Sequence, residues 1–248
     1  MLRDLTPTVK KLLIVNIVLF FVSAFIPKDL FALHFIQSPK FHYFQFITYM
    51  FLHGSLMHLF FNMFGLYMFG SILERLWGGP RFLFFFIFCG IGGGILHEVI
   101  LYFHDFKAIR DALEGVISNP NSEYLKKFFE DFSGGAETNL VNNNVTGAIE
   151  VYKSKISADE YTMVGASGGV VGALMAYAYI FPNTEMFIFP IPIPLKAKYL
   201  VMVLAFYELY AGKTAIAGDN VAHFAHLGGM LFAVILLLIW RQRRDFFY

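Results

Sequence analysis

The feature that most constrains this chain is the gathering of its apolar residues into six runs. Each run approaches the roughly 20 residues that an α-helix needs to cross about 30 Å of hydrocarbon. Because unpaired backbone groups are costly in lipid, such runs predict membrane-spanning helices. The predicted spans are residues 12–26, 46–73, 82–103, 161–181, 198–211 and 221–240. We therefore expect an all-α, polytopic membrane protein with residues 1–248 in a single domain.

The composition excludes several other classes of protein. Hydrophobic residues make up 57% of the 248 residues and charged residues 15%, whereas soluble domains average about 45–50% and about 25%. An ordinary soluble domain is thereby excluded. The formal net charge of +1 provides no basic footprint, so we expect no nucleic-acid partner. The single cysteine, Cys89, can form neither an internal disulfide nor a cysteine metal cluster.

Charges in the loops predict the orientation in the membrane, because cytoplasmic loops keep an excess of Lys and Arg. With the N-terminus inside, the inner segments hold ten such residues and the short outer loops only Lys28, Lys40 and Lys213. No small-residue cleavage pattern follows the first run, which favours a retained anchor over a signal peptide. We expect an integral protein of a bacterial inner membrane with both termini in the cytoplasm.

Residues 104–160 interrupt the apolar pattern. They hold six Lys or Arg and ten Asp or Glu residues, with an Asn-, Gly- and Thr-rich stretch around 134–147, so we expect them outside the membrane on its outer side. Apolar residues recur in this insertion at near-helical spacing, which predicts one or two amphipathic helices. These residues are Phe106, Ile109, Leu113, Leu125, Phe128 and Phe129. The insertion either packs on the outer surface as a variable element or helps to recognise a substrate.

Polar groups inside the predicted spans are costly in lipid and mark candidate functional sites. The string HGSLMHLFFN places His58 and Asn62 one helical turn apart. VGASGGVVGAL sets Ser167 among glycines, and DNVAHFAHLGG places His223 and His226 one turn apart. The alternative is structural, since hydrogen bonds between helices and close packing of small residues use the same residue types.

Together these residue types suit nucleophilic catalysis. A serine hydroxyl is a weak nucleophile at neutral pH and needs an adjacent base, for which imidazole has a suitable pKa. The oxyanion formed when a carbonyl is attacked needs preorganised donors. His58, Asn62 and backbone N–H groups near Ser167 can supply them.

Three motifs, in this order along the chain, resemble those of the rhomboid family of intramembrane serine proteases. HGSLMHLFFN, with His58 and Asn62, resembles the motif that lines the oxyanion hole. GASG with Ser167 resembles the nucleophile motif, and AHLGG with His226 resembles the motif of the general base. His53 matches an earlier histidine of the first motif, which we interpret as structural.

The resemblance implies a six-helix bundle in which a short fourth span starts below the outer surface, so that water reaches Ser167. It also implies a Ser-His dyad without a carboxylate and transmembrane protein substrates that are cleaved near their outer juxtamembrane boundary. Substrates would reach the site between the second and fifth spans. We expect no cofactor and no metal, and the sequence assigns no oligomeric state.

The chain departs from the family pattern at three places. Phe44 and Gln45 stand where many members have a Trp-Arg pair, which leaves the usual bracing of the first outer loop open. Val171 replaces an aromatic ring that packs on the catalytic imidazole, so we expect His226 to be held by another group, such as a Tyr or Phe elsewhere. The long insertion is the third departure. For Glu208, in the fifth run, we expect a carboxylate that reaches water from a helix end, and the alternative is a hydrogen-bonding or gating residue near the outer boundary.

Three other functions fit the sequence less well than a serine protease. A metalloprotease built on His97, Glu98 and His104 lacks the histidine pair of H-E-x-x-H that puts both ligands on one helical face. A non-proteolytic rhomboid-like protein that binds membrane clients has no need for both Ser167 and His226. A small transporter would need a carboxylate or ion-pair relay at mid-membrane, which the predicted spans lack.

Overall fold

The computed structural model describes a mostly helical chain that divides into two compact units. Unit 1 comprises Met1–Leu33, Tyr43–His97 and Met163–Tyr248, and unit 2 comprises His34–His42 and Glu98–Thr162. The residues described are 5–120, 122–132, 144–158, 161–188, 191–214 and 222–242. Residues 1–4 and 243–248 lie outside them, so the predicted location of the two termini stays a prediction.

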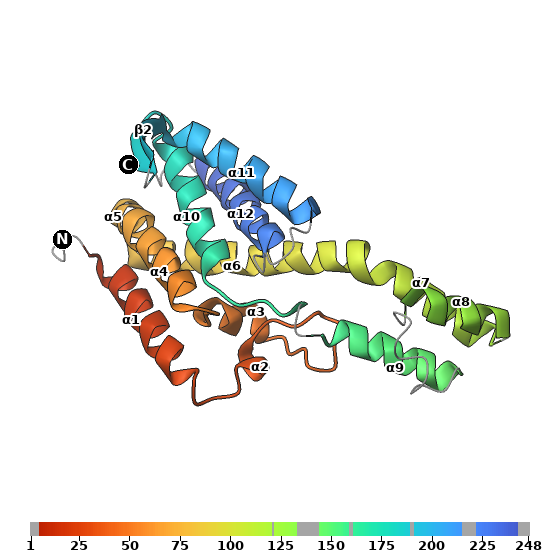
Figure 1. The fold of residues 1–248 in the computed structure, drawn as a ribbon. Helices are drawn as coiled ribbons and strands as arrows, with labels where there is room; N and C mark the ends of the chain where they lie inside the picture. Colours follow the sequence, from red (N-terminus) through yellow and green to blue (C-terminus); the bar gives the residue numbers. More distant parts are fainter. Residues whose placement is uncertain are drawn as a thin grey trace. The chain divides into compact units, whose positions relative to one another are not determined.

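Unit 1 contains the long apolar helices, which Figure 1 shows in order along the chain. Its N-terminal elements are α1 (Pro7–Val22), α2 (Lys28–Phe31), α3 (Gln45–Thr48), η2 (Tyr49–Phe51), α4 (Leu56–Gly65), the π-helical turn η3 (Leu66–Gly70), α5 (Ser71–Trp77) and the start of α6 (Gly79–Leu101). Its C-terminal elements are α10 (Ser167–Ile180), β1 (Glu185–Ile188), β2 (Ile191–Lys196), α11 (Ala197–Thr214) and α12 (His223–Gln242).

Three helices within the described residues are long and apolar enough to cross a bilayer. They are Leu56–Trp77, which joins α4, η3 and α5, then Gly79–His104 and His223–Trp240. Helix α10 is apolar but shorter. Helices α1 and α11 overlap the first and fifth predicted ranges, 12–26 and 198–211, with different ends. The polytopic membrane character is thus supported, and the count of six spans stays a prediction.

Two helices begin later than the apolar runs suggested. The second run was predicted to span residues 46–73, but its long helix starts at Leu56 because Ser55 caps it. Ser55 has an extended backbone, and its hydroxyl accepts from the backbone N–H of His58 at 3.1 Å. In the fourth run, Met163 forms an antiparallel bridge with Leu33, so α10 starts only at Ser167.

The loop predicted as the first outer loop is braced by Gln45. This side chain is fully buried, and its amide donates to the carbonyl oxygen of Leu30 at 3.1 Å. The hydroxyl of Thr48, on the same short helix α3, donates to the carbonyl oxygen of Phe31 at 2.7 Å. Two side-chain hydrogen bonds therefore hold this loop where the Trp-Arg pair is missing.

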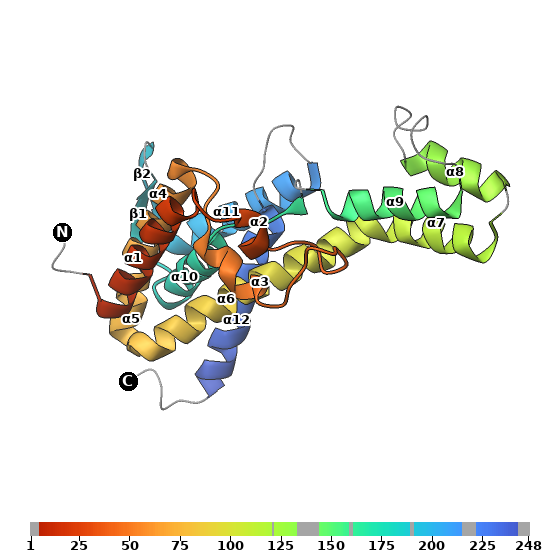
Figure 2. The same cartoon turned by 90° about the horizontal axis from the view of Figure 1, so that it is seen from below.

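The helices α6, α10 and α12 approach one another through glycines. A β-carbon at Gly229 of α12 would overlap the carbonyl oxygen of Gly168 of α10. One at Gly172 would lie 2.7 Å from the β-carbon of Cys89 of α6, and one at Gly228 would lie 2.7 Å from the carbonyl oxygen of Gly92. The three backbones can touch only because these positions lack side chains. Figures 1 and 2 show α10 and α12 side by side.

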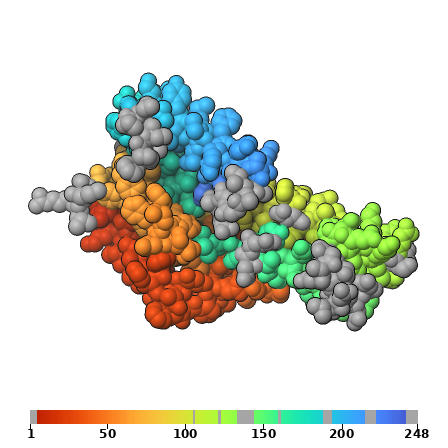
Figure 3. Space-filling view, viewed as in Figure 1, coloured from red at the N-terminus to blue at the C-terminus, as the bar shows by residue number. Residues whose placement is uncertain are grey.

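An antiparallel hairpin connects α10 to α11. Strands β1 and β2 pair with Glu185 opposite Lys196, and the register is irregular between Phe187 and Ile188. This hairpin was not predicted from the sequence, because prolines interrupt the second strand. Helix α11 then runs along α12 and forms part of the outer surface of unit 1, and the space-filling view shows α10 between α4 and α11 (Figure 3).

Within its described residues, unit 2 forms its own core from three amphipathic helices, whereas one or two were expected. They are α7 (Lys107–Ser118), which follows the π-helical turn η4 (Tyr102–Phe106), α8 (Ser122–Phe132) and α9 (Val145–Ile156). Figure 2 shows α7 and α9 side by side. The apolar residues predicted at helical spacing all belong to this core, with Leu125 only partly buried. Most of the stretch at 134–147 lies outside the described residues.

Residues 34–42 belong to unit 2 and contact its helices. The ring of Phe35 lies 4.3 Å from that of Phe106, between centroids. The backbone N–H of Ile36 donates to the buried carboxylate of Glu98 at 2.8 Å, and the hydroxyl of Tyr152 donates to the Gln37 side chain at 2.5 Å. Part of the predicted first outer loop therefore packs with the insertion. Its location outside the membrane stays a prediction.

One buried carboxylate anchors the start of α1. Glu74 of α5 is 5% exposed and accepts from the backbone N–H groups of Thr8 and Val9, both at 2.8 Å, and from the hydroxyl of Thr6. These N–H groups have no partner within α1, and an anion beside a helix N-terminus is favourable.

We predict that Glu74→Ala lowers the free energy of unfolding by about 2–3 kcal/mol, because it leaves buried donors of α1 without their charged acceptor. Thermal unfolding of the detergent-solubilised protein, followed by circular dichroism, measures the change. Glu130→Ala is the control, since Glu130 is exposed and its pair with Lys126 at 3.7 Å contributes little. Equal stability of the two variants would contradict the anchoring role.

We also predict that Gly229→Ala destabilises the bundle by about 1–3 kcal/mol, because the added methyl group meets backbone that cannot move aside. The same unfolding measurement applies. Gly115→Ala in α7 is the matched control: its nearest neighbour, the ring of Tyr124, is 3.8 Å away, and alanine favours a helix over glycine. A Gly229→Ala variant as stable as the wild type would show that α10 and α12 tolerate a wider separation.

Candidate active site

Ser167 is the first residue of α10 and follows a tightly held loop. Gly165, two residues earlier, has a φ of +130°, a conformation that residues with a side chain rarely adopt. Its N–H donates to the carbonyl oxygen of Tyr49 at 2.9 Å. The buried hydroxyl of Tyr49 donates in turn to the carbonyl oxygen of Gly90 of α6 at 2.7 Å. The loop that presents Ser167 is thus tied to two other elements.

His58, at the start of α4, lies beside Ser167 at this loop. A β-carbon at Gly165 would lie 2.7 Å from Nε2 of His58 and 3.7 Å from Oγ of Ser167. The absence of a side chain at Gly165 therefore makes room for both groups. The structure brings together these two residues, which are separated by more than a hundred positions in the chain.

Asn62, one turn further along α4, is buried and uses its side chain locally. Its amide Nδ2 donates to the backbone carbonyl oxygen of His58 at 3.0 Å. An amide carries a second N–H, so this bond leaves one donor of Asn62 for another acceptor. The structure places Asn62 on the helix that carries His58 and gives no direct contact between Asn62 and Ser167.

His53 is buried and packs against His58. Its ring meets that of His58 edge to face, with the centroids 5.1 Å apart. This packing agrees with a structural role, because an aromatic neighbour limits the orientations that the His58 imidazole can adopt.

His226, in the first turn of α12, reaches the same region through the glycine contact. It lies one turn before Gly229, which touches Gly168, the residue after Ser167. The imidazoles of His226 and His58 are also close enough for their charges to interact. Hence α12 brings His226 to the end of α10 that carries Ser167.

The environment of Glu208, on α11, differs from the predicted one. The expectation of a carboxylate that reaches water is wrong: Glu208 is 4% exposed and bonds two histidines of α12. Its Oε1 lies 2.9 Å from Nδ1 of His226, and its Oε2 lies 2.6 Å from Nδ1 of His223. The group that holds His226 in the absence of an aromatic residue at 171 is therefore a carboxylate and not a Tyr or Phe.

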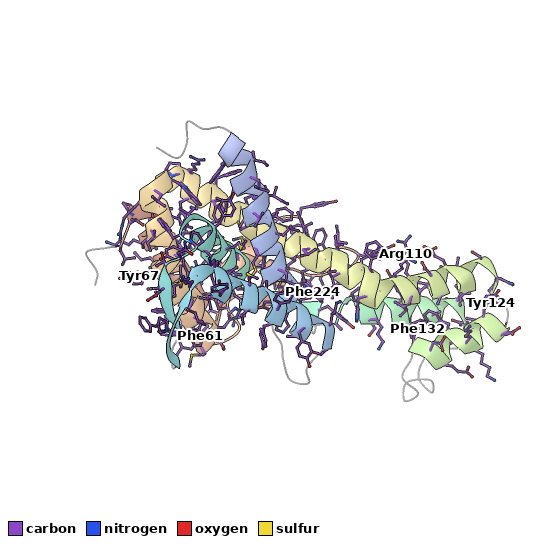
Figure 4. The ribbon with its side chains drawn as sticks, turned by 90° about the horizontal axis from the view of Figure 1, so that it is seen from above. Phe61, Tyr67, Arg110, Tyr124, Phe132 and Phe224 are labelled. Carbon is purple, nitrogen blue, oxygen red and sulfur yellow. The ribbon has the colours of Figure 1, made fainter. Side chains whose placement is uncertain are left out.

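The packing of α11 on α12 keeps this carboxylate away from solvent. The ring of Phe224, labelled in Figure 4, lies against Gly212 of α11, where a β-carbon would be 3.0 Å from it. His223 faces α11 as well, since its β-carbon would be 3.2 Å from that of a residue at 212. Its ring meets that of Tyr207 edge to face at 6.0 Å.

The sequence left a hydrogen-bonding role of Glu208 open as an alternative, but its partners His223 and His226 were not identified although a signal was present. Two histidines one turn apart at the start of an apolar helix lie on neighbouring faces, and a single carboxylate on an adjacent helix can bond both. Which helix packs beside them is a tertiary feature that spacing along the chain does not contain. Among the described residues, no group of His, Cys, Asp and Glu side chains has the arrangement of a metal site.

The family model described as Rhomboid domain matches residues 40–105 and 137–243. These two segments cover α4, α10, α11 and α12, and the unmatched stretch between them contains α7 and α8. A comparison with curated protein sequences finds no match.

Proposed function

Since the chain belongs to the rhomboid family of intramembrane proteases, we propose that it is a serine endopeptidase that cleaves transmembrane or juxtamembrane segments of membrane proteins. It is an integral membrane protein whose apolar helices act within the lipid bilayer. The observation that carries the proposal is the position of Ser167 at the start of α10, with His58 beside it and His226 brought in by the glycine contact of α12.

In the proposed reaction, Oγ of Ser167 attacks the scissile carbonyl carbon while His226 takes the hydroxyl proton. The tetrahedral intermediate collapses to an acyl-enzyme when His226 returns this proton to the leaving amine. Water, with His226 again as the base, then hydrolyses the ester. Because Nδ1 of His226 faces Glu208, Nε2 is the nitrogen that remains to exchange the proton.

The proposed oxyanion hole combines side chains of α4 with the N-terminus of α10. The first N–H groups of a helix have no partner within it and carry partial positive charge, which suits a developing oxyanion. His58 lies beside Ser167, and the second N–H of Asn62 is a further donor from the same face. Catalytic hydrogen bonds often tighten only when substrate is bound.

The remaining features of the proposal concern the setting of the site. Transmembrane proteins are the partners, and they reach Ser167 between the second span and the helix α11. Both termini lie in the cytoplasm, the membrane is a bacterial inner membrane, and the helices of unit 2 stand on the outer side. The whole chain acts as one rhomboid-like membrane domain that carries this helical insertion.

We predict that a fluorophosphonate probe labels the wild-type protein covalently and that Ser167→Ala abolishes both this label and the cleavage of a model transmembrane substrate. Gel fluorescence and substrate cleavage in proteoliposomes measure the two outcomes. The control is Ser71→Ala, which removes another buried membrane serine and keeps both signals. Labelling of Ser167→Ala at the wild-type level would refute the nucleophile, and binding of substrate without cleavage by the wild type would favour a client-binding protein.

We predict that Asn62→Ala lowers kcat about 10–100-fold with little change in KM, because it removes one donor to the oxyanion. Initial rates over a substrate series separate the two constants. Asn16→Ala is a matched control, since buried Asn16 of α1 makes the same bond to the carbonyl oxygen four residues earlier, at 2.7 Å. Wild-type turnover of Asn62→Ala would mean that His58 and backbone N–H groups form the oxyanion hole without Asn62.

A further inference from the structure

We propose that Glu208 is a positioning residue for the general base, so that the site works as a Ser-His-Glu arrangement and not as a dyad without a carboxylate. This inference rests on the proposed protease function. Glu208 accepts a hydrogen bond from Nδ1 of His226 at 2.9 Å and thereby directs the opposite nitrogen of the ring, Nε2, away from α11.

The chemistry of the two groups assigns the tautomer of His226. An ionised carboxylate can only accept hydrogen bonds, so Nδ1 must carry the proton of the neutral imidazole. Nε2 then has the free lone pair that a general base needs. Without such a partner, a neutral imidazole divides between two tautomers, and the tautomer protonated at Nε2 cannot accept the serine proton.

Electrostatics adds a second effect during the reaction. When His226 takes the proton of Ser167, the imidazolium carries a positive charge while only 14% of its side chain is exposed. The negative charge of Glu208, 2.9 Å from Nδ1, stabilises that charge. A buried carboxylate is costly unless it is paired, and the two histidines provide this pairing in the resting enzyme.

His223 serves to hold Glu208 in place. It is more deeply buried than His226, with 7% of its side chain exposed against 14%, and it bonds the other carboxylate oxygen at 2.6 Å. It also faces Gly212 and Tyr207 of α11, whereas His226 lies near His58. The two bonds fix both oxygens of the carboxylate, so the oxygen that faces His226 has a defined direction.

The identity of residue 171 is consistent with this assignment. The aliphatic side chain of Val171, four residues after the nucleophile, can offer neither an aromatic face nor a hydrogen bond to the imidazole. The restraint on His226 must therefore come from another element, and α11 supplies it through Glu208.

The test compares Glu208→Gln with the wild type in proteoliposomes. The amide keeps the size of the side chain but removes the charge, and it can accept from only one of the two imidazoles. We expect kcat to fall about 10²–10⁴-fold, with KM within about threefold and the rate of fluorophosphonate labelling at Ser167 reduced in parallel. Glu208→Asp, which keeps the charge on a shorter side chain, should recover part of kcat.

Nitrogen NMR of the histidine side chains measures the tautomer of His226, which a purely structural role of Glu208 would leave unchanged. In the wild type, His226 should be in the form protonated at Nδ1, and in Glu208→Gln it should exchange between two tautomers. His223→Gln is the matched control: it removes the other partner of the carboxylate, and its kcat should fall far less than that of His226→Gln. A His223→Gln variant as inactive as His226→Gln would overturn the division of roles.

The outcomes separate this inference from the proposed function. If Ser167→Ala abolishes cleavage while folded Glu208→Gln keeps wild-type kcat, the protease assignment stands and the dyad acts without Glu208. If Ser167→Ala still cleaves, the protease assignment itself fails. If Glu208→Gln unfolds the protein, the kcat of Glu208→Asp and the tautomer of His226 become the deciding measurements. The positioning role is refuted if Glu208→Asp folds but recovers no kcat and the tautomer of His226 is unchanged.

Discussion

The site depends on the contact of backbone with backbone between α10 and α12. Gly229 touches Gly168 so closely that no side chain fits between them, and Gly172 and Gly228 meet α6 in the same way. In lipid, apolar side chains gain little by leaving their surroundings, so helices associate through close packing and polar bonds. Ser167 precedes Gly168, and His226 lies one turn before Gly229. The contact between the two glycines therefore sets the distance between Ser167 and His226.

The polar groups of unit 1 are arranged around this packing. Buried carboxylates are expensive in a membrane unless donors meet them, and both Glu74 and Glu208 have such donors. Glu74 takes the N-terminal N–H groups of α1, and Glu208 takes two imidazoles of α12. Glu74 joins two helices that are distant in sequence and Glu208 joins two consecutive ones, so each contributes to the geometry of the bundle as well as to its stability.

Much of the fold follows from local patterns. Apolar runs predicted the long helices because a helix is the only way for a single segment to pair its backbone in lipid, and apolar spacing at 106–129 predicted amphipathic helices that do form a core in unit 2. Helix starts were less accurate, since the cap at Ser55 and the bridge of Met163 with Leu33 override hydropathy. The hairpin after α10 was not predicted, because a short two-stranded element has no strong periodic signal.

The sequence alone determined which residue types stand beside glycines in the apolar runs, and hence the family and the candidate nucleophile, base and oxyanion donors. These are local properties: a motif is legible because its residues are adjacent in the chain. The tertiary structure decided that Glu208 is buried and bonded to His226 and His223, and that His58 meets Ser167 at Gly165. These are contacts between separate elements, set by which helices pack together and at what rotation.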